Sequence, residues 1–511
     1  MSYKLALVSP PLRATSRKLP ISLLQLAGYT DKYVKGAETF IVYIKRKPYF
    51  RLTKNEFKEI KKQIVEEIAA KKPQMVGFTI LFSDVLDSIE LAQEVRKRLP
   101  DAVIIAGGVH ASYRPDELLY EGSVFDYVVI GEGERTLKEL VEAHIKSKEN
   151  KIGLKEIKKI RGLAYMNKEN KIIETGFREL IQDLDEVPMI PYEKIDTEFY
   201  FKPDLTQIYY FLFSSSFLMT TRGCPSRCTF CTGNDLWKKT CGSYAIRSCS
   251  VERTLDELEI LVNKYKVDGI FISDQSFTYN RERAKKICEG IIKRGLKFIW
   301  QAQTKAFMVD DELVGLMKKA GCIQLCFGFE SGSQEALNRM KKGITIEQIK
   351  NATRICQKHG MRLFPCFMIN TPGETFEELQ KTRELIDWVD GPKTYYNFAV
   401  CIPFPGSQIY DELGKKKFEK NEYADLTDTT DDYIRKEKRI KMCKHNVDLV
   451  DEITRLNKKY NPIRKRIFMH LDPIYLKQIL RSKRKLQYIK EGMEIIKFIL
   501  HKVFTGERAA G

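Results

Sequence analysis

The sequence predicts an α/β protein with two parallel-sheet domains and a helical C-terminal region. Two alternations of short apolar strands with amphipathic helices lead to this prediction, and an irregular stretch separates them. No strand candidate follows the second alternation. With 511 residues the chain is too long for one ordinary domain. We therefore expect four segments, at residues 1–145, 146–215, 216–410 and 411–511.

The first segment, residues 1–145, is expected to be a doubly wound, flavodoxin-like domain. Its five strands are almost wholly apolar, as they are when helices cover both faces of a parallel sheet; they read KLALV, TFIVYIK, MVGFTILF, AVIIAGGVH and FDYVVIGEGE. The helix after the second strand has Phe57, Ile60, Ile64 and Ile68 on one face, at spacings of three and four. Such a sheet has the strand order 2-1-3-4-5, and ligands bind at the carboxyl ends of its strands.

The second alternation predicts a different sheet. Residues 146–215 are irregular and are expected to be a linker with a small hairpin. Residues 216–410 then contain six strand–helix repeats, from FLMTT to YYNFAVCI. A closed (β/α)8 barrel requires eight repeats, so we expect an open, partial (β/α)6 barrel. The last segment, residues 411–511, is helical in pattern and basic.

The composition indicates a soluble, globular, cytoplasmic protein. Hydrophobic residues make up 43% and charged residues 30% of the chain. No apolar run approaches the roughly 20 residues needed to cross a bilayer, and the start MSYKLALVSPP lacks the features of a secretory signal. The twelve cysteines are then expected to bind metal or to be buried, because thiols stay reduced in the cytosol.

Three cysteines lie close together in MTTRGCPSRCTFCTG, directly after the first strand of the second domain. Cys224, Cys228 and Cys231 can converge at the carboxyl end of that strand, where parallel α/β proteins bind their ligands. Three thiolates suit zinc or an iron–sulfur cluster. Zinc would take a fourth ligand, for which Cys241 is available. A 4Fe–4S cluster held by three cysteines leaves one iron open to another ligand.

The segment CPSRCTFC resembles the CxxxCxΦC motif of the radical S-adenosylmethionine (SAM) superfamily, with Phe230 as the aromatic residue Φ. The resemblance implies that SAM chelates the open iron through its amino and carboxylate groups. One electron from a low-potential donor then cleaves SAM to methionine and a 5′-deoxyadenosyl radical. This radical abstracts hydrogen from the substrate.

The same resemblance implies SAM contacts at the ends of the later strands. Six residues occupy these positions, namely Asp274, Gln303, Glu330, Ser331, Ile369 and Gly373. By position, Asp274 is expected on the amine side. Glu330 and Ser331 are expected at the sugar, and Ile369 and Gly373 at the adenine.

Each of these residues also has a purely structural interpretation. Asp274 could cap the next helix, Glu330 could pair with a lysine, and the TPGE segment around Gly373 could be an ordinary strand-to-helix turn. The Gly-Gly-Glu that the family usually has after the second strand is replaced here by Ser-Asp-Gln. The ligands of the SAM amine therefore differ from the family pattern.

Together, the two sheet domains resemble the cobalamin-dependent radical SAM enzymes, a group that includes methyltransferases and the bacteriochlorophyll ring cyclase. The matching segments are KLALVSPP, IIAGGVHAS, DYVVIGEGERTLKEL and DLDEVP, and the resemblance covers residues 4–412. It implies that cobalamin binds at the strand ends of the first domain, where small residues allow close approach; these are Ser83, Gly107, Gly108, Gly131 and Gly133. The DxHxxG motif of other cobalamin proteins is missing, and His110 is expected to pack or to contact the cofactor's tail.

The remaining cysteines are expected to be buried as small hydrophobic residues. Cys322 and Cys326 are four apart on one strand and are expected to point to one face. The basic tail, in which residues 434–511 hold 21 Lys or Arg against 8 Asp or Glu, has two interpretations. Its helices could pack on the barrel, or they could bind an anionic membrane surface peripherally. Nucleic acid is disfavoured as a partner, because no nucleic-acid-binding module is recognisable.

The leading prediction is a cobalamin-dependent radical SAM enzyme that methylates an unactivated carbon of a small-molecule or lipid substrate. The first alternative is a radical enzyme that does not methylate but catalyses cyclisation or C–C coupling. The second alternative belongs to another class, a zinc-stabilised nucleic-acid-binding protein that would use the three cysteines and Cys241.

Overall fold

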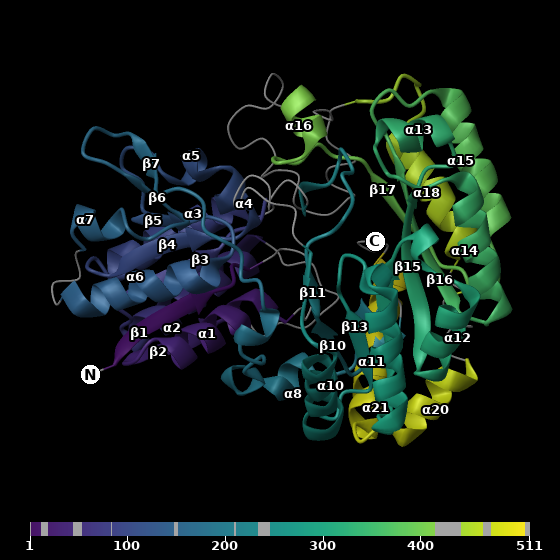
Figure 1. Ribbon diagram of the computed structural model, residues 1–511, viewed down its shortest axis with the longest axis horizontal. Helices are drawn as coiled ribbons and strands as arrows, with labels where there is room; N and C mark the ends of the chain where they lie inside the picture. Colours follow the sequence, from purple (N-terminus) through teal and green to yellow (C-terminus); the bar gives the residue numbers. More distant parts are fainter. Residues whose placement is uncertain are drawn as a thin grey trace.

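The computed structural model describes residues 2–11, 19–43, 54–82, 84–147, 152–208, 211–233, 246–413, 441–462, 465 and 472–505. Two α/β domains lie next to each other, and the C-terminal helices pack on the second domain (Figure 1).

The N-terminal domain confirms the predicted strand order. Its parallel strands are ordered β2-β1-β3-β4-β5, with bounds β1 Tyr3–Val8, β2 Ala37–Val42, β3 Met75–Thr79, β4 Val103–Gly107 and β5 Tyr127–Val129. Its helices are α1 Ile21–Tyr33, α2 Lys54–Lys71, α3 Val85–Arg98, α4 Val109–Tyr113, α5 Pro115–Leu118 and α6 Gly133–Ser147. The predicted apolar face of α2 packs on the sheet, with Phe57, Ile64 and Ile68 buried and Ile60 partly buried.

The predicted hairpin extends this sheet. It consists of β6 (Leu163–Met166) and β7 (Ile172–Glu174), and β6 pairs antiparallel with β5. The segment expected to be a linker therefore supplies two strands of a seven-stranded sheet. The rest of this segment contains α7 Leu154–Ile157, η1 Leu184–Glu186, η2 Tyr192–Lys194, α8 Thr197–Tyr200, β8 Asp204–Ile208 and β9 Phe211–Phe213.

The second domain is an open barrel of six parallel strands in chain order, as predicted. The strands are β10 Ser215–Leu218, β13 Gly269–Ile272, β14 Ile299–Thr304, β15 Cys322–Glu330, β16 Arg362–Ile369 and β17 Asn397–Val400. The outer helices are α10 Val251–Glu259, η3 Ile260–Lys264, α11 Arg281–Lys293, α12 Asp311–Lys319, α13 Gln334–Arg339, α14 Ile346–Lys358 and α15 Phe376–Val389. Short 3-10 turns η4 Phe277–Tyr279 and η5 Ala306–Met308 follow β13 and β14.

Helix starts are fixed by side chains in this domain. Thr345 and Thr375 begin α14 and α15 with capping boxes, and Asn280 and Asp310 accept hydrogen bonds from the first turns of α11 and α12. Each cap satisfies backbone N–H groups that have no partner inside the helix. The caps thus fix where the outer helices of the barrel begin.

One prediction for β15 is wrong. Cys322 and Cys326 belong to different hydrophobic clusters instead of sharing one face. The cause is a register shift between β14 and β15, where Trp300 pairs with Cys322 but the next residue, Gln301, pairs with Gln324. One extra residue in a strand reverses the faces of all residues after it.

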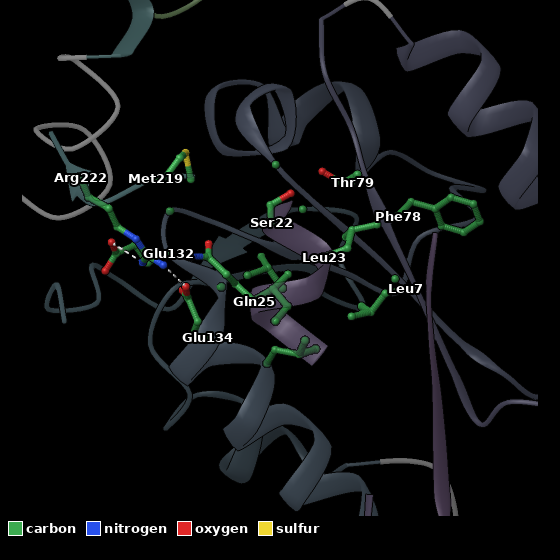
Figure 2. Close-up of a pocket in the computed structure, with 18 of the residues that line it drawn as sticks. Leu7, Ser22, Leu23, Gln25, Phe78, Thr79, Glu132, Glu134, Met219 and Arg222 are labelled. Atoms are coloured by element: carbon green, nitrogen blue, oxygen red, sulfur yellow. Dashed lines mark hydrogen bonds and ion pairs between the residues drawn. The ribbon is translucent and has the colours of Figure 1, made fainter. Parts of the chain in front are cut away.

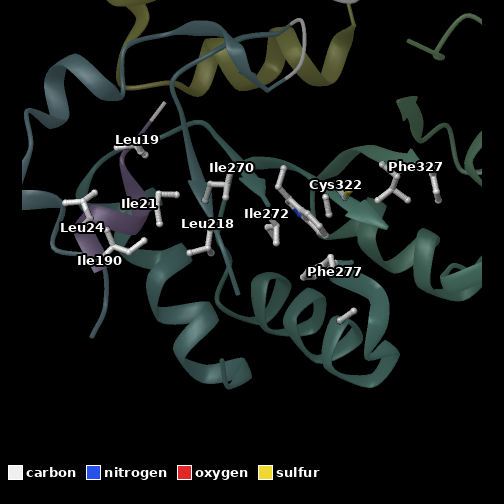
Figure 3. Close-up of a cluster of buried hydrophobic side chains, with 14 of the residues drawn as sticks. Leu19, Ile21, Leu24, Ile190, Leu218, Ile270, Ile272, Phe277, Cys322 and Phe327 are labelled. Carbon is white, nitrogen blue, oxygen red and sulfur yellow. The ribbon is translucent and has the colours of Figure 1, made fainter. Parts of the chain in front are cut away.

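A continuous hydrophobic cluster joins the two domains. Leu19, Ile21 and Leu24 of the N-terminal domain belong to the same cluster as Leu218 and Ile270 of the barrel (Figure 3). The two sheets are therefore held together by apolar packing. A site between them has walls that are fixed relative to each other.

The C-terminal region is helical where it is described, with α16 Gln408–Leu413, α18 Leu449–Tyr460, α20 Pro473–Arg481 and α21 Lys485–Thr505. The hydroxyl of Tyr488 donates to Asp268, which directly precedes β13, at 2.9 Å. This places α20 and α21 at the N-terminal ends of the barrel strands. Among the described residues, no helix is both long and apolar enough to cross a bilayer.

Candidate active site

The three clustered cysteines lie in the loop that follows β10 at the carboxyl end of the barrel. A short ribbon leads into the loop, with β11 (Thr221–Arg222) pairing antiparallel to β12 (Arg247–Ser248). All three cysteines are free thiols and partly exposed. The loop is tied to the barrel, because Thr229 N donates to Met340 O at 3.0 Å and Thr229 O accepts from Ile409 N at 3.1 Å.

Two lysines make the surroundings of this loop electropositive. Lys305, at the end of β14, is close enough to interact electrostatically with all three cysteines. Its side chain is buried, and no hydrogen-bond partner among the described residues reaches its Nζ. Burial lowers the pKa of Lys305, and Cys224 and Cys228 act in the opposite direction. A buried cation without a partner fits a site for an anionic group.

The second lysine, Lys342, pairs with Glu330. Its Nζ donates to Glu330 Oε1 at 2.7 Å, and both side chains are 9% exposed. Glu330 therefore forms the ion pair with a lysine that was expected as its structural role. Lys342 also lies 5.8 Å from the ring centroid of Phe230. Gly328 leaves room for the pair, because a Cβ at this position would meet Glu330 Oε1 at 2.2 Å.

Asp274 supports the segment that leads into the cysteine loop. Its carboxylate accepts hydrogen bonds from Thr220 N at 2.6 Å, Thr221 N at 2.9 Å and Thr220 Oγ1 at 2.6 Å. The side chain is fully buried, and burial raises its pKa despite these hydrogen bonds. The carboxylate therefore holds the strand end before Cys224 in place and does not cap the next helix.

The other predicted SAM residues lie at neighbouring strand ends. Gln303 is partly exposed near the end of β14, while Ser331 is buried and its Oγ lies 3.1 Å from Thr382 Oγ1. Ile369 ends β16 and is buried. Gly373 has φ +71° and donates to Met442 O at 2.9 Å. These residues thus lie at the carboxyl end of the barrel, as we expected from the sequence.

A cavity of about 290 Å³ lies between the two domains, at the carboxyl ends of the N-terminal strands (Figure 2). Four of the five residues predicted to bind cobalamin line it: Gly107, Gly108, Gly131 and Gly133. The fifth, Ser83, lies outside the described residues. Gly108 is also required by the fold, because its φ is +98° and a Cβ would meet Ile80 O at 2.8 Å. The four glycines have no side chain at the strand ends, so a flat, bulky ligand can approach the backbone closely there.

The barrel forms the opposite wall of the same cavity. Met219, Thr221, Arg222 and Gly223, which immediately precede the cysteine loop, line it. The cavity therefore connects the strand ends of the N-terminal domain with the segment that carries Cys224.

A buried ion network crosses the domain interface at this cavity. Arg222 pairs with Glu132 at 2.9 Å and with Glu134 at 2.5 Å (Figure 2). Arg247 also pairs with Glu132, at 2.9 Å. Burial acts to raise the pKa of Glu132, but the hydrogen bonds and charges of the two arginines outweigh it, so the net pKa is lowered. The network fixes the cysteine loop to the N-terminal domain. Arg222, two residues before Cys224, therefore helps to hold the two domains together. We did not predict this role from the sequence, because only small residues were considered at the cavity.

His110 is fully buried and lies in the first turn of α4. Its Nε2 lies 3.2 Å from Glu117 Oε2, and its ring lies edge-on to Phe82. His110 is not among the residues that line the cavity. The structure thus agrees with the expectation that it packs.

The other described cysteines are mostly buried, as predicted: Cys249, Cys288, Cys322, Cys326, Cys356, Cys401 and Cys443. Burial raises the pKa of Cys322 to about 12, which keeps it a neutral thiol. Cys241, the predicted fourth zinc ligand, lies outside the described residues. Within the described ranges, no three His, Cys, Asp or Glu side chains are arranged around a single ion. A 4Fe–4S cubane does not require three side chains around one ion, since each cysteine binds a different iron of the cluster.

Comparison with known proteins supports both halves of the site. Residues 218–386 match the Radical SAM superfamily, and residues 33–141 match the B12 binding domain. The chain is 33% identical over 340 residues to uncharacterized methyltransferase PH0819 of Pyrococcus horikoshii, covering 66% of this chain and 69% of that protein. It is 28% identical over 400 residues to the anaerobic magnesium-protoporphyrin IX monomethyl ester cyclase of Rubrivivax gelatinosus, covering 77% of this chain and 65% of that one.

The fold is similar to that of a solved methyltransferase. The radical S-adenosylmethionine methyltransferase TsrM from Kitasatospora setae, solved with cobalamin and a [4Fe-4S] cluster bound, superimposes with a TM-score of 0.65 at 20% identity. The match covers 81% of this chain and 78% of that chain. The chain therefore belongs to the cobalamin-dependent radical SAM enzymes, whose cofactors are a 4Fe–4S cluster, SAM and cobalamin.

Proposed function

We propose that this enzyme transfers a methyl group to an unactivated carbon of a small-molecule substrate. When bound, the cluster and SAM supply a carbon-centred radical, and cobalamin supplies a transferable methyl group. One observation carries the proposal: the cavity has the glycine floor on one side and the residues before Cys224 on the other. This arrangement supports the proposal that the two cofactors bind next to each other. Two of the similar proteins described above are named methyltransferases.

The side chains of this site have separate proposed roles. Cys224, Cys228 and Cys231 bind the cluster. Lys305 provides a buried positive charge beside them, which suits both an anionic cluster and the carboxylate of SAM. Asp274 acts through Thr220 and Thr221 as a positioning residue. The SAM contacts proposed from position are Gln303, Glu330, Ser331, Ile369 and Gly373.

Methyl transfer can be tested without knowledge of the substrate. The reduced enzyme, loaded with cobalamin, is incubated anaerobically with SAM that carries a labelled methyl group. We expect the label in the extracted corrin, and then in an acceptor when a metabolite extract is added. Formation of 5′-deoxyadenosine with no label in the corrin or in any acceptor would reject methylation.

That negative result would favour radical cyclisation or C–C coupling instead. The similarity to the magnesium-protoporphyrin IX monomethyl ester cyclase is the observation that favours this second candidate. The zinc-stabilised nucleic-acid-binding alternative receives no support from the family matches.

The Lys305→Met substitution is predicted to make the cluster harder to reduce. Removal of a buried positive charge beside an anionic cluster disfavours the addition of an electron. We expect the midpoint potential to fall by roughly a hundred millivolts, the order expected for one nearby charge at an effective dielectric constant of about 20. A redox titration monitored by electron paramagnetic resonance measures this shift. Lys305→Arg should keep the wild-type potential, and equal potentials in wild type and Lys305→Met would contradict the assigned role.

The basic tail does not support a lipid substrate. The described helices α20 and α21 lie at the N-terminal ends of the barrel strands, next to Asp268, whereas the cofactor cavity is at the carboxyl ends. We therefore propose a small-molecule substrate that enters at the carboxyl end.

A further inference from the structure

The outward side of the C-terminal helices is strongly apolar. Leu480 of α20 is 71% exposed, and Leu486 of α21 is 75% exposed. Ile489, Met493 and Ile496 continue along α21 and are 59%, 50% and 58% exposed. Spacings of three, four and three residues place the four α21 side chains on one face of the helix. We call these five residues the apolar stripe. Exposed large apolar side chains gathered on one face mark an interaction site.

The stripe is not a sign of loosely attached helices. The opposite side of α20 and α21 is bound to the barrel through Asp268, which accepts hydrogen bonds from Ser482 Oγ at 2.6 Å and Tyr488 Oη at 2.9 Å. Tyr475 donates to Leu212 O at 3.1 Å. These three anchoring side chains are buried. The inner face of these helices therefore packs and hydrogen-bonds on the neighbouring strands. The apolar side chains of the outer face stay exposed.

Positive charge surrounds the stripe. Residues 473–497 contain seven Lys or Arg against two Asp or Glu. Five of these basic residues are exposed, namely Lys477, Arg481, Lys483, Lys485 and Lys490. Leu486 also borders a depression of about 480 Å³, whose lining includes Lys266, Lys483 and Lys485. Basic groups at the edge of an apolar face fit phosphate groups above an apolar layer.

We propose that the apolar stripe and its surrounding cations bind the surface of an anionic lipid bilayer, with α21 lying in the plane of the interface. Charge decides between a bilayer and a second copy of this chain. Two copies joined through this face would bring two strongly basic surfaces together, which is unfavourable. An anionic bilayer offers the opposite charge at its surface and an apolar layer beneath it. The attachment is peripheral, since no described helix is suited to span the membrane.

The location of the stripe fixes the orientation of the bound enzyme. Asp268, which anchors the tail helices, precedes β13, and Ser273, which lines the cofactor cavity, follows the same strand. A bilayer at the stripe would therefore lie at the end of the barrel opposite the cavity. The membrane surface holds the enzyme in place, and the cavity stays open to the aqueous side.

Vesicle flotation of the complete chain tests this proposal. The vesicles consist of phosphatidylcholine alone or of phosphatidylcholine mixed with phosphatidylglycerol, at low and high salt. We expect flotation only with the anionic vesicles, and weaker flotation at high salt. Two variants test the apolar stripe and the surrounding cations separately. The apolar variant is Leu486→Gln/Ile489→Gln/Met493→Gln, and the cation variant is Lys483→Gln/Lys485→Gln/Lys490→Gln.

Each variant should reduce the bound fraction by about tenfold or more. A matched control replaces exposed apolar residues elsewhere, in Leu154→Gln/Phe177→Gln/Ile292→Gln, and should float like the wild type. Circular dichroism confirms that every variant is folded, which is expected because only exposed side chains change. Three results would each overturn the proposal: no flotation of the wild type, equal flotation of the apolar variant, or a wild-type dimer in light scattering that the apolar variant converts to a monomer.

Discussion

Cys228→Ala is expected to remove most of the iron from the reconstituted enzyme and to abolish SAM cleavage. The three cysteines of the loop are the only thiolates proposed to bind the cluster, so two remaining ligands would hold it poorly. Turnover of SAM to 5′-deoxyadenosine should fall by about a thousandfold or more, since without the cluster no electron reaches SAM. Iron and sulfide analysis, together with chromatography of the SAM products, measures both losses.

The matched control for this experiment is Cys288→Ala. Cys288 is fully buried on α11 and, among the described residues, belongs to the hydrophobic core and not to the loop. Its replacement should leave the iron content unchanged and cost only a small part of the folding stability. Full iron content and full SAM cleavage in Cys228→Ala would show that the cluster is bound elsewhere.

Arg222→Met is expected to destabilise the protein by about 3–5 kcal/mol, because it removes the cation that pairs with buried Glu134 and one of the two cations that pair with buried Glu132. Arg222 is 12% exposed, and its two partners Glu132 and Glu134 are each 6% exposed. The substitution should also weaken cobalamin binding, since Arg222 and both glutamates line the cavity. Urea denaturation measures the free energy of unfolding, and a spectroscopic cobalamin titration measures the affinity.

An exposed ion pair provides the control for this substitution. Lys171 and Glu169 pair at 3.1 Å, and each side chain is 71% exposed. Lys171→Met should change the free energy of unfolding by no more than about 1 kcal/mol. The double variant Arg222→Met/Glu134→Gln should recover part of the lost stability, because it removes the buried charge of Glu134 that Arg222→Met leaves unpaired. A cost for Arg222→Met no larger than that of Lys171→Met would contradict the role of the network.

Local patterns in the sequence were sufficient to predict both sheets. Apolar strands and helical periodicity are short-range properties, and they predict the strands and helices of both domains. The strand order of the first domain was expected from the doubly wound fold class that this alternation indicates. The segment 146–215 shows the limit of this approach. Its hairpin is a local feature, but the pairing of β6 with β5 is a long-range contact that no pattern within the hairpin specifies.

The candidate site was predicted through its motifs and its glycines. Gly107, Gly108, Gly131 and Gly133 were expected at the cavity because small residues end adjacent strands. The charged residues were missed. Lys305 directly follows β14, and Glu132 and Glu134 alternate with the predicted glycines in GEGE, so their positions at strand ends were visible. Their partners were not, because Arg222 and Glu134 are 88 residues apart in the chain.

The metal content of the purified protein is the most direct test of the cluster site and the cobalamin site. Iron, cobalt and zinc are counted per chain after anaerobic purification and reconstitution with iron, sulfide and cobalamin. We predict about four iron atoms, as in one cubane, and about one cobalt per chain. One zinc with no iron would contradict the cluster, and a full complement of iron with no cobalt would contradict the cobalamin site in the cavity.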